Sequence, residues 1–84
     1  MDNSSIINYE DLILKFLSYM YLENMSIANL AEEIGVSKQT LYRWLTGRYN
    51  LSRKSLLKIS IFLKDFTPSP EILNYIKTNL NLFL

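Results

Sequence analysis

The sequence predicts an all-α fold, a compact bundle of about five short helices. Apolar residues recur at intervals of three and four along most of the chain, serines stand where several of these runs begin, and glycines or prolines separate the runs. The chain has 84 residues, 49% of them hydrophobic, which is enough for one small core. We therefore expect residues 1–84 to form a single domain.

The first two helices are predicted from apolar spacing and from the residues that flank it. We expect the first over residues 9–22, with an apolar face formed by Leu12, Ile13, Phe16, Leu17 and Met20. Ser26 is a suitable N-cap for a second helix, in which Ile27, Leu30, Ala31 and Ile34 share one side. Gly35 follows directly, at a point where a chain leaving a helix commonly needs a left-handed residue.

The segment after Ser37 predicts a third helix with two different faces. Leu41, Trp44 and Leu45 fall on one side, which indicates that Trp44 packs in the core rather than stacking on a base. The other side carries long polar side chains, namely Gln39, Tyr42, Arg43 and Thr46, with Lys38 at its edge. Gly47 is expected to end this helix.

Two further helices are expected in the second half of the chain. Ser52 is the N-cap of a helix through about residue 64. Residues 57–63 also alternate as a strand would, but a lone strand would lack a partner, and the length and the cap favour a helix. Ser69 followed by Pro70 predicts a last helix to about residue 80, after which an apolar tail closes the chain.

The composition disfavours an enzyme and a membrane protein. The chain has no cysteine and no histidine, and no Gly-rich loop or metal-ligand spacing accompanies its acids, so we expect no catalysis, no metal and no cofactor. The apolar run 12–22 is too short to span a bilayer and contains Lys15. The acidic start of the chain does not resemble a secretory signal, and we expect a cytoplasmic protein.

The charges of the chain are unevenly distributed although their sum is only +1. Residues 1–33 contain six acids and one base. Residues 34–64 contain no acid and seven bases, which are Lys38, Arg43, Arg48, Arg53, Lys54, Lys58 and Lys64. If this block folds onto one surface it favours a polyanion as partner, whereas a solvated helix face that happens to lack acids is the simpler alternative.

Residues 27–46 have the features of a helix-turn-helix. Ala31 permits close approach of two helices, Gly35 suits a sharp turn, and the apolar residues around them fill the space between. The stretch IANLAEEIGVSKQTLYRWLT resembles the lambda repressor and Cro-like family of helix-turn-helix regulators, often called the XRE family. With one helix before it and two after it, the likeness extends over roughly residues 12–65.

The resemblance implies a binding mode for duplex DNA, in which the second motif helix enters the major groove. Carried over to this chain, it implies base readers at Lys38, Gln39 and Arg43, and contacts to bases or phosphates from Ser37, Tyr42 and Thr46. The sugar-phosphate backbone would be held by Arg48, Asn50, Arg53 and Lys54, with help from the helix N-termini at Ser26 and Ser52. The chain departs from the family at Ile27, where many members carry glutamine, and its first helix lacks a positive charge in its second half.

The apolar tail raises the question of dimerisation. Residues 68–84 are a candidate dimerisation element because large apolar residues close the chain, namely Leu80, Leu82, Phe83 and Leu84. The alternative is that the tail folds back on its own core. With a dimer, the resemblance implies a transcriptional regulator, most simply a repressor that reads an inverted repeat without a cofactor.

Two other functions are compatible with the sequence. The same scaffold suits a protein-binding module such as an antitoxin or a phage-encoded inhibitor, which the apolar residues of the first helix and the tail favour. A membrane-surface protein would use Lys54, Lys58 and Lys64 as the basic face of an amphipathic helix beside Ile61 and Phe62. We do not favour a membrane partner, because those apolar side chains are needed for the core.

Overall fold

Helices make up all the regular structure in the described part of the chain. The computed structural model describes residues 9–47 and 50–83, apart from the side chains of residues 9, 10 and 83. Its helices are α1 (Tyr9–Glu23), α2 (Ile27–Ile34), α3 (Lys38–Leu45), α4 (Arg53–Phe62), α5 (Pro70–Thr78) and α6 (Leu80–Phe83). The prediction of an all-α fold is confirmed, and the five expected helices lie within about two residues of their expected bounds.

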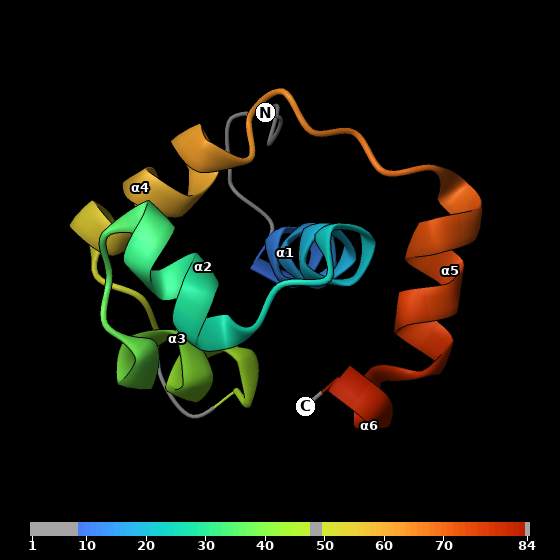
Figure 1. Cartoon of the computed structure of the whole chain (residues 1–84), viewed down its shortest axis with the longest axis horizontal. Coiled ribbons are helices and arrows are strands. Elements are labelled where there is room, and N and C mark those ends of the chain that lie inside the picture. The colour runs from blue at the N-terminus through green and yellow to red at the C-terminus, as the bar shows by residue number, and fades with distance from the viewer. Residues whose placement is uncertain (1–8, 48–49, 84) are drawn as a thin grey trace, which may run out of the picture.

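Helix α1 lies at the centre of the bundle (Figure 1). In the view of Figure 1, α2, α3 and α4 lie on one side of α1, and α5 packs against it on the other. Because it is covered on both sides, α1 buries Leu12, Phe16 and Leu17 and also Leu14, which was not part of the expected apolar face. Ser18 is buried too, and its hydroxyl donates to the carbonyl oxygen of Leu14 at 2.7 Å, which satisfies it inside the helix.

Four helices begin at the serines that the sequence predicts as N-caps. In each case the serine Oγ accepts a hydrogen bond from the backbone N–H three residues later, the usual geometry of a cap. The pairs are Ser26 with Asn29 (3.1 Å), Ser37 with Thr40 (3.0 Å), Ser52 with Ser55 (3.2 Å) and Ser69 with Ile72 (3.2 Å). The predicted starts of α2, α3, α4 and α5 are therefore confirmed.

Helix α4 resolves the ambiguity between helix and strand. Ile59 and Leu63, four residues apart, are fully buried, whereas Leu57 and Ile61 are each 57% exposed. The apparent alternation thus arises because two apolar residues lie on the outer face of a helix. The expectation that Ile61 is needed for the core is therefore wrong, whereas Phe62 does pack against the core. On its inner face, the ring of Phe62 makes an edge-to-face contact with Tyr19 of α1, with the ring centroids 5.3 Å apart.

The C-terminal tail departs from the prediction. Helix α5 stops at Thr78, and residues 80–83 form the short helix α6, where the sequence suggests only an apolar tail. Asn79 lies at the break as the C-cap of α5, and both its backbone N–H and its side-chain amide donate to the Tyr75 carbonyl oxygen, at 3.0 and 2.9 Å. Leu80 then folds back against the core, while Leu82 remains 75% exposed.

Candidate nucleic-acid interface

Helix α3 is anchored by its inner face. Leu41, Trp44 and Leu45 are all at least 97% buried, as the spacing predicts. The Trp44 ring meets Phe16 of α1 edge to face at a centroid distance of 5.7 Å. The indole therefore serves the core, and the contact fixes which side of α3 points to solvent.

The turn between α2 and α3 is held from both sides. Gly35 has the left-handed φ of +89°, and the amides of Gly35 and Val36 both donate to the Ala31 carbonyl oxygen, at 2.9 and 3.1 Å. The ammonium group of Lys58, on α4, donates to the carbonyl oxygen of Gly35 at 3.0 Å. This bond joins residues 23 positions apart and ties α4 to the turn, so at least one lysine of the basic block has a structural contact.

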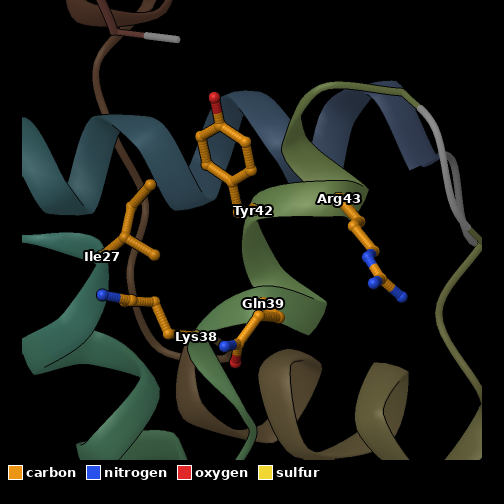
Figure 2. A pocket seen from close by; sticks show the side chains of 5 residues that line it. All are labelled: Ile27, Lys38, Gln39, Tyr42 and Arg43. Atoms are coloured by element: carbon orange, nitrogen blue, oxygen red, sulfur yellow. The ribbon is translucent and has the colours of Figure 1, made fainter.

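The outer face of α3 presents the expected base readers together. Lys38, Gln39, Tyr42 and Arg43 are all exposed, and with Ile27 of α2 they line a hollow of about 400 Å³ (Figure 2). Within the described part of the chain, the side chains of Lys38, Gln39 and Arg43 have no hydrogen-bond or ion-pair partner. They remain available to an external ligand, and two of them carry a positive charge.

Ser37 and Thr46 lie at the two ends of α3, and their hydroxyl protons are already engaged. Ser37 Oγ donates to Thr40 Oγ1 at 2.7 Å, in addition to its role as N-cap. Thr46 Oγ1 donates to the carbonyl oxygens of Tyr42 and Arg43, at 2.9 and 3.2 Å. Since a phosphate accepts hydrogen bonds but does not donate them, either hydroxyl would have to rotate before it could bind one.

The residues expected to hold phosphates lie on other segments. Arg53 and Lys54 are exposed on the first turn of α4, directly after the cap at Ser52, and Asn50 is exposed in the preceding loop. Ser26 is exposed at the start of α2, next to Ile27, which lines the hollow. Arg48 lies outside the described residues, as does Leu84 of the tail.

A comparison with known families agrees with this geometry. The sequence model of the helix-turn-helix family matches residues 20–73, well over half of the chain, and that span contains α2, α3, α4 and the turns between them. The chain belongs to this helix-turn-helix family. This family is of the XRE or lambda repressor-like type, as the motif suggests, and its members are DNA-binding regulators that are not typically enzymes. No similar protein was found among curated proteins, and no similar fold among solved structures.

Two contributors to the helix-turn-helix were missed from the sequence. Ile27 packs against the core, as its spacing on α2 predicts, but it is only half-buried and also lines the hollow beside α3. Its spacing groups it with Leu30 and Ala31. Its position at the rim of the hollow follows only from the way α3 packs beside α2. Lys58 was grouped with the other bases, and its bond to Gly35 has no local sequence signal, because it depends on how α4 packs.

No group of three or more acids in the described ranges lies close enough to hold a metal ion. None of the helices described is long and apolar enough to cross a membrane.

Proposed function

We propose that this helix-turn-helix protein is a sequence-specific regulator of transcription that binds duplex DNA through α3 in the major groove. One observation carries the proposal. The inner face of α3 is locked into the core, and its outer face offers Lys38, Gln39 and Arg43 without partners in the described structure. Such a protein acts where DNA is accessible, which in a bacterial or phage-infected cell is the cytoplasm, and this mode of binding needs no cofactor.

The chemistry of these side chains suits the edges of base pairs. Gln39 can form two hydrogen bonds to adenine N6 and N7, and Arg43 or Lys38 can donate to guanine O6 and N7. Tyr42 lies between them on the same face, 50% exposed. These residues read the sequence, while Arg53 and Lys54 hold the sugar-phosphate backbone together with Arg48, Asn50 and the amides at the starts of α2 and α4.

We further propose that the protein is a dimeric repressor. Two copies related by a two-fold axis would place their α3 helices one DNA turn apart, about 34 Å, and so read an inverted repeat. Leu82 is the best supported contact residue of the tail, because it is the most exposed of the large apolar residues in the described ranges. Occupying a promoter would be sufficient for repression.

Selection of binding sites from a random pool of duplex DNA tests the proposal. We expect an enriched inverted repeat whose affinity falls steeply between two salt concentrations, since phosphate contacts release counterions. A variant with Lys38, Gln39 and Arg43 all changed to alanine should keep its helical circular dichroism and lose the enrichment. Equal, weak binding of the wild-type protein to every duplex would show that sequence reading is not its function.

A protein-binding role is the second candidate, and an exposed apolar surface favours it. Tyr21 and Leu22 of α1 are 44% and 47% exposed, and the ring of Tyr21 lies 5.4 Å from that of Tyr75 of α5. Tyr75 is itself 43% exposed. If no DNA site is enriched, this surface and Leu82 are the places where substitutions should abolish binding of a partner protein, as in an antitoxin or a phage-encoded inhibitor.

A further inference from the structure

The hollow beside α3 differs in chemistry from the charged face around it. Ile27 forms one wall from α2, and the ring of Tyr42 stands across from it on α3 (Figure 2). Neither the isoleucine side chain nor the face of the tyrosine ring offers a conventional hydrogen bond. The part of the hollow between them therefore favours an apolar group, although cations and an amide border it.

The charged residues at its border indicate where that apolar group comes from. The side chain of Lys38 extends from α3 toward Ile27, and Gln39 is the next residue of α3. The side chain of Arg43 extends away on the far side of Tyr42 (Figure 2). No acid occurs between residues 34 and 64. A ligand that brings an apolar group into this setting must also carry negative charge and hydrogen-bond acceptors.

Thymine in duplex DNA meets all of these requirements. Its C5-methyl is the one apolar group that the four unmodified base pairs present in the major groove, and O4 and the phosphates provide acceptors and charge nearby. A phosphate alone would leave Ile27 and Tyr42 without a matching group, and burying it against them would cost solvation.

We propose that the hollow between Ile27 and Tyr42 is a subsite for the C5-methyl group of a thymine. This inference rests on the proposed function and deepens it, because it assigns a specificity-determining role to a residue of α2. Recognition of the base sequence would then come from both helices of the motif, with the polar side chains of α3 reading hydrogen-bonding groups and Ile27 reading shape.

Replacing thymine by uracil removes the methyl group and leaves the base pair intact. Each thymine of the selected site is changed singly to uracil, and the affinity of the wild-type protein is measured on every duplex. We expect one position in each half-site to lose about 3- to 10-fold in affinity, which is the loss of one well-packed methyl group. Other thymines should change affinity by less than about 2-fold.

Two variants connect this loss to the hollow. For each of the variants Ile27→Ala and Tyr42→Ala, the affinities for the thymine duplex and the uracil duplex should agree within about 2-fold. The reason is that the variant has already lost the contact with the methyl group. Tyr42 is half exposed and its replacement should leave the fold intact, which protects the test if Ile27→Ala is unstable. Leu57→Ala, an exposed aliphatic residue on α4, is the control and should keep the full wild-type discrimination.

The outcomes separate the subsite from the function on which it rests. A selected site that lacks a fixed thymine, or that tolerates uracil at every position, would overturn the subsite and leave the DNA-binding proposal standing. Unchanged discrimination in both variants would place the methyl contact elsewhere and also overturn it. If no site is enriched at all, both proposals fail together.

Discussion

Arg43 and Arg53 carry the same charge on two different helices, and this difference in position separates their expected roles. Arg43 stands on the outer face of α3, beside Gln39 and Tyr42, with no partner in the described part of the chain. We expect Arg43→Ala to lose about 1 to 3 kcal/mol of binding free energy on the selected site and to relax the base preference at one position. Titration against duplexes that vary one base pair at a time measures both effects.

Arg53 is exposed on the first turn of α4 and is expected to contact only a phosphate. Arg53→Ala should therefore weaken binding to every duplex by a similar factor and make the salt dependence shallower by about one unit of log–log slope. Lys77→Ala, which removes a positive charge from α5, is the matched control and should change neither quantity. If Arg43→Ala and Arg53→Ala both lowered affinity uniformly on all sequences, the division between base readers and phosphate contacts would be wrong.

At the residue scale, the sequence predicts which side chains of α3 face outward, because the 3.6-residue period is fixed by the helix itself. It does not predict how their hydrogen bonds are used. The spacing of Thr46 predicts a contact to a base or phosphate, yet its hydroxyl donates to the carbonyl oxygens of its own helix. Such local bonds compete with external ones and depend on a rotamer, which a sequence pattern does not specify.

At the scale of the elements, the turn at Gly35 determines how α3 is presented. A β-carbon on Gly35 would meet the Lys58 ammonium only at ordinary contact distance, 3.7 Å, so the requirement for glycine comes from its φ of +89°. We expect Gly35→Ala to lower the free energy of unfolding by about 1 to 2 kcal/mol, the cost of a left-handed backbone for an ordinary residue. Urea denaturation followed by circular dichroism measures it.

Gly35→Asn is the matched control, since asparagine tolerates the left-handed region better than alanine. It should lose clearly less stability than Gly35→Ala, even though its side chain is larger. A loss in Gly35→Asn as large as that in Gly35→Ala would show that crowding, rather than backbone strain, makes glycine necessary here.

The ends of the helices show what local chemistry can predict. The four serine caps and the left-handed Gly35 were found from the sequence because each acts within three or four residues of the chain. Helix α6 was missed because four residues contain little more than one turn and so have no periodicity to detect. The burial of α1 on two sides was missed for a different reason. It depends on α5, which follows α1 in the chain only after α2, α3 and α4 but packs against it.

At the scale of the whole molecule, the arrangement of the helices divides the surface into two regions. Helices α2, α3 and α4 carry the helix-turn-helix motif and the helix that follows it, while α5 packs on the other side of α1 and contacts α6 (Figure 1). Much of the apolar surface that the sequence gives to α1 is used inside this bundle, where Phe16 is buried and Tyr19 contacts the rings of Phe62 and Phe66. Among the side chains of the tail that the structure describes, Leu82 is the large apolar one that remains exposed. A substitution of Leu82 is therefore the most direct test of dimerisation.

Leu82→Glu should weaken the proposed dimer without unfolding the monomer. Leu82 is 75% exposed, so a glutamate there remains solvated in the monomer but would place a charge in an apolar contact between two copies. We expect the dimer dissociation constant from sedimentation equilibrium to rise at least about 10-fold, corresponding to roughly 1.4 kcal/mol. Leu57→Glu introduces the same change at a leucine that is 57% exposed on α4, and it should leave the dissociation constant unchanged. An equal effect of both substitutions would indicate a general effect of charge, and no effect of Leu82→Glu would mean that two copies associate through another surface.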